Sequence, residues 1–493
     1  MIFTIGSFVF VTALVAFISW LKTRNTDETN KDGYFLGGRS LTGWVIFGSL
    51  MMTNLSAEQL VGRNGQGYAA GMTAMGWETM CPIALTLMAL FFVPKYFKLG
   101  ISTIPEFLED RYDRKTRVIV SFIFLVAYIV TMLPLVLYAG SVAMERIFDI
   151  TGLLGGNRFM ATVVMCVALG IIGGVYAIFG GLKAVAVSDT LNGIIFIAGA
   201  AILIPVLAFI ALGDGSIAEG IRIFATASPE HLNAIQPADA LPPYIPWPMI
   251  IIGCGINHIS YWCTNQSIMQ RVLGAKNLKE AQKGALITGL ACVFCPIFLV
   301  APGIIQFIRD GGVLTDFDMA YPTLIRDILP TPVLGFFAAV MFGAILSSFN
   351  SVLNSSMTLF SLDVLPAISK KQRSDEQLIK TAKRFGIVLC LASIAIAPFL
   401  MYLPAGISTF LNEMWGVLRR AGARDRGHGY AEPPYPELCA ENGHCGTYRV
   451  LCADDEPAAV PLPVFRNRDI YHRPCPAVDL CQGQAAWDTI CPA

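Results

Sequence analysis

The residues best suited to chemistry lie inside strongly apolar stretches of the chain. One such stretch, 333–353 with its continuation, carries small and hydroxyl side chains at helical spacing on one face. These residues are Ala344, Ser347, Ser348, Ser351, Asn354 and Ser355. The adjacent pair Ser347-Ser348 supplies two neutral oxygens close together, which suits a hard monovalent cation. Small hydroxyl residues also join membrane helices to one another, and for 351–355 this structural role is an equal alternative.

A second polar stretch, 53–59, interrupts another apolar segment just before the glycine-rich run 62–67. Asn54, Ser56 and Glu58 make this helix a candidate to break near its middle. A break would free backbone carbonyls that can coordinate a cation. The alternative is that the helix ends early and places Glu58 at the membrane interface.

A third candidate is Glu78, which lies beside Trp77 in an otherwise apolar run. An ionisable group at membrane depth is a functional candidate by default. The aromatic ring suits the C–H groups of a polyol, while the carboxylate accepts its hydroxyls; a neutral, structurally hydrogen-bonded Glu is the equal alternative. The sequence shows no nucleophile–base motif, phosphate loop or HExxH site. It therefore predicts a carrier rather than an enzyme.

The composition indicates which elements position these residues. Of 493 residues, 55% are hydrophobic and only 14% are charged, whereas soluble proteins carry about 25% charged residues. This composition argues against an ordinary soluble enzyme and against a disordered chain. The net charge of zero argues against a nucleic-acid partner. A polytopic protein of the lipid bilayer fits best.

Eleven segments are apolar enough and, except for the last, long enough to cross a hydrocarbon core of about 30 Å. They are 2–21, 40–59, 74–97, 118–143, 159–179, 184–212, 243–269, 285–308, 333–353, 385–403 and the incomplete 406–417. The loops on one side hold 21 lysines and arginines in total, and those on the other hold 6. The positive-inside rule then predicts cytoplasmic basic loops and an N-terminus outside. The expected location is the bacterial inner (plasma) membrane.

The tail 418–493 differs in character from the rest of the chain. It begins inside an apolar helix and holds six of the 13 cysteines, without helical or strand periodicity. We interpret it as out-of-frame or foreign sequence joined to a truncated membrane protein. The alternatives are a metal site at Cys439, His444, Cys445 and Cys452 or a small disulfide-bonded module.

Several motifs resemble those of the sodium:solute symporter family. They are YFLGGRS at 34–40, NLSAEQ at 54–59, ISTIPEFLEDRY at 101–112, YAIFGGLKA at 176–184 and YWCTNQ at 261–266. The last of these, with the Gln270-Arg271 pair, resembles the sodium/sugar branch, namely the galactose or glucose cotransporters. The matches run in order from about residue 30 to residue 417.

The resemblance implies an all-α polytopic membrane protein with a LeuT-like core of two inverted five-helix repeats, here C-terminally truncated. The leading helix and a cytoplasmic loop would occupy 1–39, and the first repeat 40–212. An extracellular loop at 213–242 would precede the second repeat at 243–417, whose last helix is incomplete. The broken helix of the first repeat would have its counterpart in 243–269.

The resemblance also implies a sodium site. It falls on the carbonyls of Met52, Leu55 and Ala344 and on the hydroxyls of Ser347 and Ser348. Asp189 matches a family carboxylate on the sodium exit route.

The sugar site of the family carries over only in part. Gln59, Glu78 and the gating aromatic Tyr261 match, and Trp77 replaces another aromatic. Four further positions differ from the galactose transporter, which has Ser, Asn, Lys and Gln where this chain has Cys81, His258, Cys292 and Asn412. The sequence therefore does not specify which sugar is bound.

Together these features predict sodium-driven symport of a sugar or related polyol, by alternating access around a site at the bilayer midplane. Sodium is the expected coupling ion, and a small sugar is the expected substrate. One alternative is a non-transporting membrane sugar sensor on the same scaffold. Another is an inactive truncated fragment of the symporter. The sodium stoichiometry and the oligomeric state are not specified by the sequence.

Overall fold

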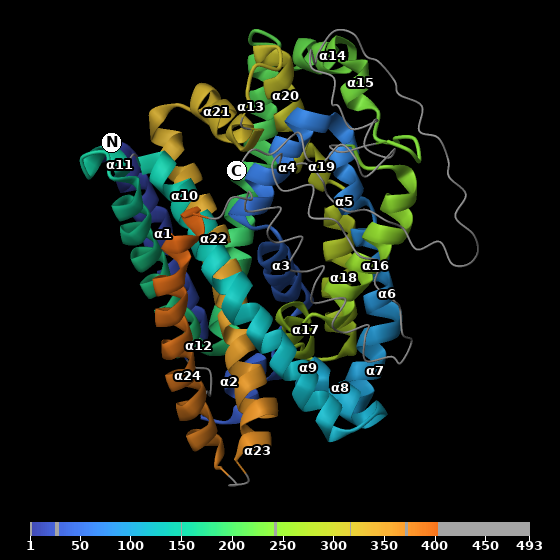
Figure 1. Ribbon diagram of the computed structural model, residues 1–493, viewed down its shortest axis with the longest axis vertical. Coiled ribbons are helices and arrows are strands. Elements are labelled where there is room, and N and C mark those ends of the chain that lie inside the picture. The colour runs from blue at the N-terminus through green and yellow to red at the C-terminus, as the bar shows by residue number, and fades with distance from the viewer. Residues whose placement is uncertain are drawn as a thin grey trace, which may run out of the picture. The chain divides into compact units, whose positions relative to one another are not determined.

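The computed structural model shows an almost entirely helical protein (Figure 1). It describes residues 2–24, 29–148, 150–240, 244–315, 317–369 and 373–402. The predicted eleventh span, Asn412 and the tail 418–493 lie outside the described residues. Among the described residues the only β-type pairings are two isolated bridges, Leu41 with Ala275 and Gln236 with Pro246.

Long apolar helices account for most of the predicted spans. They include α1 (Ile2–Thr23), α9 (Arg114–Ala127), α10 (Leu133–Phe148), α12 (Arg158–Phe196), α13 (Ile204–Leu212), α22 (Thr331–Leu359) and α24 (Asp375–Ile396). Six continuous helical segments of the described chain are long and apolar enough to cross a membrane, and a bent pair beginning with α18 (Leu278–Cys292) makes a seventh. This number of spans is smaller than the predicted number, partly because the fifth and sixth predicted spans form one helical segment with a kink at Gly181. Spans interrupted in mid-course also fail as continuous helices.

The second predicted span is broken, as its polar stretch indicates. α3 (Gly43–Asn54) ends at Leu55, and α4 (Ala57–Ala70) begins after Ser56. Ser56 has extended backbone, and its side chain accepts a hydrogen bond from the backbone N–H of Gln59 at 3.2 Å, which caps α4. Because α4 continues for 14 residues, the helix breaks rather than ends early.

The seventh predicted span is broken in the same manner. α16 (Gly255–Thr264) and α17 (Gln266–Leu273) are separated by Asn265, whose backbone is extended. The Asn265 side chain accepts from the N–H of Ser267 at 3.0 Å and so caps α17. Each half of the chain thus contributes one discontinuous helix.

α3 lies at the centre of the helical assembly (Figure 1), in contact with α12, α17, α18 and α22. Small residues allow the close approach of α12. A Cβ on Gly48 would lie 2.8 Å from Cα of Thr190, and a Cβ on Gly193 would lie 3.2 Å from the side chain of Met52. Membrane helices use such small residues to bring their backbones together. The first half of the broken helix is therefore held by tight packing.

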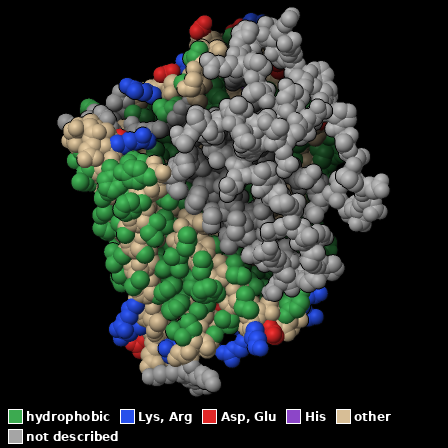
Figure 2. Space-filling view, viewed as in Figure 1, with side chains coloured by type: hydrophobic (Ala, Val, Ile, Leu, Met, Phe, Trp, Pro, Cys, Tyr) green, Lys and Arg blue, Asp and Glu red, His purple; other side chains and the backbone are tan. Residues whose placement is uncertain are grey.

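The outer surface is strongly apolar. Figure 2 shows a broad band of hydrophobic side chains over the helices, with lysines and arginines beyond its lower and upper ends. Residues such as Phe17, Ile171 and Val388 are largely exposed, as expected where lipid replaces water. Arg271, which was counted among the basic residues of the loop 270–284, is instead fully buried in α17.

The contact between α4 and α20 (Ala301–Asp310) generates a packing prediction. A Cβ on Gly303 would lie 1.9 Å from the carbonyl oxygen of Asn64, whose side chain accepts from the Gly303 N–H at 3.0 Å. We expect Gly303→Ala to force the helices apart, at the cost of about 1–3 kcal/mol typical of overpacking. The thermal unfolding midpoint of the detergent-solubilised protein measures this loss.

Gly62→Ala in α4 is the matched control, because no heavy atom lies within 4 Å of its added Cβ. It should leave the midpoint unchanged or raise it slightly, since Ala is the better helix former. Equal midpoints for the two variants would contradict the close packing of α4 and α20.

Candidate cation and solute site

The break between α3 and α4 deprives two carbonyls of their helical donors. In a regular α-helix each N–H donates to the carbonyl four residues earlier. Here the Ser56 N–H donates to the carbonyl of Asn54 at 3.1 Å, and the Gln59 N–H donates to Oγ of Ser56. The carbonyls of Met52 and Leu55, which those two donors would otherwise reach, are the ones that the sequence predicts as cation ligands.

The two serines predicted as cation ligands lie on α22, which packs against α3. Ser347 is 1% exposed and Ser348 is 5% exposed, and neither hydroxyl makes a hydrogen bond of ordinary geometry with any described residue. Other serines of α22 bond the carbonyl one turn earlier, as Ser356 does to Val352 at 2.8 Å. Buried oxygens without partners carry a desolvation cost, which a bound cation would remove. The donor set of neutral oxygens therefore fits sodium.

Two other polar residues of this helix face, Ser351 and Ser355, serve a structural role. Ser355 donates to Oε1 of Gln270 on α17 at 2.8 Å, and Oγ of Ser351 lies 3.0 Å from that of Thr53 on α3. Ala344 is fully buried within α22. Of the two interpretations of 351–355, the structure supports helix association for Ser351 and Ser355.

Asp189 lies on α12 and is fully buried beside α3. Its Oδ2 accepts from the hydroxyl of Ser49 at 2.7 Å, and that hydroxyl accepts from Nε of Arg271 at 3.0 Å. Arg271 Nη2 lies 3.9 Å from the same carboxylate oxygen. A buried carboxylate needs such a partner, because an isolated charge in this environment is costly.

The Arg271 guanidinium joins the carboxylate to the serine face of α22. It also donates to Oγ of Ser351 and to the carbonyl of Ser267, and Ser351 in turn donates to the carbonyl of Ser347 at 2.6 Å. Arg271 is predicted from the sequence only as part of a motif, and its buried position beside Asp189 was not predicted. A usable signal was present, since the charge falls within two turns of the polar break at 265.

Side chains from other helices form hydrogen bonds at the second break, which separates α16 from α17. The hydroxyl of Tyr128 donates to Oδ1 of Asn265 at 2.5 Å, and that of Tyr96 donates to the carbonyl of Cys263 at 3.1 Å. Oε1 of Gln266 accepts from the N–H of Ile104 at 2.8 Å. Side chains therefore brace the second break, and one of its carbonyls, that of Cys263, has a side-chain donor.

Two of the predicted solute residues, Glu78 and Trp77, lie against one arginine. Glu78, on α5 (Gly76–Thr79), is buried, and its Oε1 lies 3.9 Å from Nε of Arg63 on α4. The Arg63 guanidinium lies 4.9 Å from the centroid of the Trp77 ring. Gln59 precedes Arg63 by one turn, and its Oε1 is buried without a hydrogen-bond partner among the described residues. Sequence reasoning did not single out Arg63.

The other predicted solute residues come from helices packed on α6 (Cys81–Leu87). The Sγ atoms of Cys81 and of Cys292 on α18 lie 3.1 Å apart, and both residues are buried. Tyr261 and His258 lie on α16, which also contacts α6. Nδ1 of His258 lies 2.8 Å from the carbonyl of Cys254 in its own helix. Asn412 lies outside the described residues.

Comparison with known proteins places this arrangement in a family. The sodium:solute symporter family profile matches residues 34–423, and the chain belongs to that family. It is 44% identical over 412 residues to the uncharacterized symporter YidK of Escherichia coli (strain K12). This alignment covers 83% of this chain and 71% of that protein. It is 31% identical over 414 residues to the sodium/glucose cotransporter of Vibrio parahaemolyticus, with 80% and 74% covered.

Among solved structures, a sodium-coupled sialic acid symporter in a substrate-bound, outward-open state has the same fold. The TM-score is 0.71 at 22% identity, and the match covers 85% of this chain and 84% of that one. The predicted LeuT-like fold is thereby confirmed. Family membership makes the chain a multi-pass membrane protein that carries out sodium-coupled symport of a small solute, and not an enzyme.

The buried Asp189–Arg271 pair generates a stability prediction. Asp189→Asn and Arg271→Gln each leave one buried charge uncompensated, a loss of about 3–5 kcal/mol. The double variant leaves neither charge, so it should be less destabilised than the sum of the singles. Unfolding midpoints of the four proteins in one detergent measure the coupling.

Lys380→Gln is the control, since Lys380 pairs with Glu376 at 3.9 Å where both side chains are exposed. It should not shift the midpoint. Strict additivity of Asp189→Asn and Arg271→Gln would show that the two buried charges do not interact.

Proposed function

We propose that this chain couples the entry of sodium to the uptake of a sugar or related polyol. Met52, Leu55, Ala344, Ser347 and Ser348 would bind the sodium ion. The observation that carries the proposal is that two carbonyls without their helical donors and two buried hydroxyls, which make no hydrogen bond of ordinary geometry with a described residue, lie on neighbouring helices. The two sets belong to α3 and α22, which pack together.

In this proposal sodium couples because it adds ligand bonds between α3 and α22 to their packing and to the contact of Thr53 with Ser351. Ligands from the break of α3 and from α22 would fix the relative position of these helices when the ion is bound. If the solute favours the same arrangement, each ligand raises the affinity for the other. One charge moving through about 100 mV releases about 2.3 kcal/mol for the transport of the solute.

Asp189 fits a role on the route by which sodium leaves. Its carboxylate bonds Ser49 and faces Arg271, and the hydrogen bonds of Arg271 continue through Ser351 to the carbonyl of Ser347. A sodium ion released from Ser347 and Ser348 would meet a carboxylate whose charge Arg271 already balances. Asp189 could therefore bind the ion weakly and release it.

The solute is proposed to meet Gln59, Trp77, Glu78, Tyr261, Cys81, His258 and Asn412, with Arg63 holding Glu78. The thiol pair of Cys81 and Cys292 offers an uncharged wall with weak donors. Hydroxyl recognition would therefore fall mainly on Gln59 and Glu78. The sodium/glucose and sodium/myo-inositol cotransporters among the relatives support a polyhydroxylated solute.

The proposed orientation places the basic loops in the cytoplasm and the N-terminus outside, in a bacterial inner membrane. The excess of 21 over 6 basic residues supports it. The burial of Arg271 reduces the first number to 20 without removing the excess.

The sodium site predicts a specific loss in Ser348→Ala. The substitution removes one oxygen ligand from a charged ion. This loss should cost about 1.5–3 kcal/mol, which is about 10- to 100-fold in sodium affinity. The sodium concentration giving half-maximal uptake into proteoliposomes should rise accordingly. Ser356→Ala is the control, since its hydroxyl already bonds within α22. An unchanged sodium dependence in Ser348→Ala would refute the site.

The solute site predicts a separation of solute uptake from sodium binding. Glu78→Gln should raise the concentration of labelled hexose or inositol that gives half-maximal uptake. Sodium binding to the purified protein should stay intact. Glu219→Gln, on an exposed helix where Glu219 pairs with Arg222, should affect neither. Saturable binding without sodium-driven flux would instead indicate a sensor and contradict the proposed symport.

A further inference from the structure

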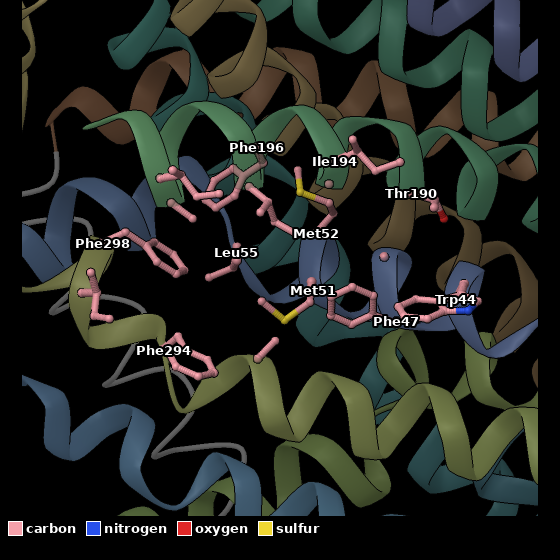
Figure 3. Close-up of a pocket in the computed structure, with 17 residues that line it drawn as sticks. Trp44, Phe47, Met51, Met52, Leu55, Thr190, Ile194, Phe196, Phe294 and Phe298 are labelled. Carbon is pink, nitrogen blue, oxygen red and sulfur yellow. The ribbon is translucent and has the colours of Figure 1, made fainter. Parts of the chain in front are cut away.

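A cavity of about 660 Å³ lies beside the broken helix, away from the proposed solute residues. Its walls come from α3, from α12 with the following turn 197–203, and from α18 with α19 (Cys295–Leu299). Figure 3 shows Met51, Met52 and Leu55 on one side of it and Phe294 and Phe298 across from them. Its volume is that of a pocket for an organic ligand.

The lining offers an occupant almost nothing but apolar contact. The one side chain with a hydrogen-bonding hydroxyl is Thr190. That hydroxyl lies 2.7 Å from the carbonyl of Ala186 and 3.2 Å from that of Val45, so its proton is already engaged. A sugar or an ion would lose its hydrogen bonds with water in this cavity, and the indole N–H of Trp44 is the main side-chain donor there to replace them. An alkyl chain has no hydrogen bonds with water to lose.

The mouth of the cavity opens on the face that meets lipid. Trp44 is 58% exposed, Ile194 is 61% exposed and Phe294 is 55% exposed, although all three line the cavity. The neighbouring Leu290 and Val293 of the α18 segment are equally exposed. The cavity surface is therefore continuous with the membrane surface, and acyl chains are the molecules present at its mouth.

One end of the cavity carries positive charge. Nζ of Lys283 lies 5.3 Å from the centroid of the Trp44 ring, at the start of α3. Lys276 and Lys279 are exposed on the same stretch. The one acid there, Glu280, is engaged because its carboxylate accepts from the N–H of Gly43. Trp and Lys together are typical of the level of lipid headgroups.

We propose that this cavity binds an anionic phospholipid of the leaflet that faces Lys283. One acyl chain lies along Met51, Met52 and Phe294, and the phosphate meets Lys283. Transfer of a chain from the bilayer is nearly neutral, because lipid is as apolar as the cavity. The headgroup charge therefore decides which lipid stays.

The position of the cavity gives the bound lipid a mechanical role. Met52 and Leu55 turn their side chains to the cavity wall, and their carbonyls flank the break. α3 and α18 meet closely at one end, where a Cβ on Gly284 would lie 2.5 Å from the side chain of Ile46. A chain lying against both helices adds to this packing and stabilises their present arrangement. This consequence for sodium binding rests on the proposed function, whereas lipid binding does not.

Retention of lipid by the purified full-length chain tests the site. The protein is equilibrated with equal amounts of dioleoyl phosphatidylglycerol and dioleoyl phosphatidylcholine, and bound lipid is counted by native mass spectrometry. A basic residue near the membrane surface is worth about fivefold for an anionic lipid, so phosphatidylglycerol should be preferred by about that factor. Lys283→Gln should abolish the preference, whereas the exposed Lys380→Gln should keep it.

A cavity-filling variant separates the chain from the headgroup. Ala201 lines the cavity, so Ala201→Phe should lower retention of both lipids, while Val206→Phe on the neighbouring lipid-facing surface should not. Unfolding midpoints confirm that the variants are folded. In the unaltered protein, a phosphatidylglycerol carrying a diazirine in its acyl chain should crosslink to peptides containing Met52 or Phe294. Crosslinks confined to other helices, or equal retention in all variants, would overturn the proposal.

Discussion

The interruption of the α3–α4 helix at Leu55 and Ser56 is the feature on which the rest of the structure depends. An apolar interior has no water to satisfy a broken helix, so each freed backbone group needs a partner. Ser56 meets part of this demand by capping α4 and by turning its own N–H back to Asn54. The carbonyls of Met52 and Leu55 are left without helical donors, and this deficit makes the site attractive to a cation.

The packing around the break keeps α3 in place while leaving those carbonyls available. Glycines at 48 and 193 bring α12 against α3, and the Arg271 guanidinium ties α3, α12, α17 and α22 together through Ser49, Asp189 and Ser351. Tyr96 and Tyr128 brace the second break, at Asn265. The two discontinuous helices are thus alike in backbone, and the break at Leu55 and Ser56 is the one proposed to bind the cation.

The same constraint explains the apolar cavity behind α3. A helix that stops in mid-membrane presents bulky side chains such as Met51, Met52 and Leu55 on the face opposite the cation ligands. Those side chains are themselves buried. The lipid-facing opening lies instead at Trp44, Ile194 and Phe294, which line the cavity and are exposed. The helix break is therefore placed between a polar network on one side and a space suited to lipid on the other.

Local chemistry in the sequence determined the membrane class, the break near Ser56 and the serine pair on α22, since hydropathy, polar interruptions and helical spacing are properties of contiguous residues. The family motifs determined the fold and the coupling ion. Only the tertiary structure decided which polar residues meet. Arg63 reaches Glu78, Arg271 reaches Asp189, and Cys81 touches Cys292 across 15, 82 and 211 positions. Such partners depend on how helices cross, and a residue's type and spacing carry no record of what lies opposite in a distant helix.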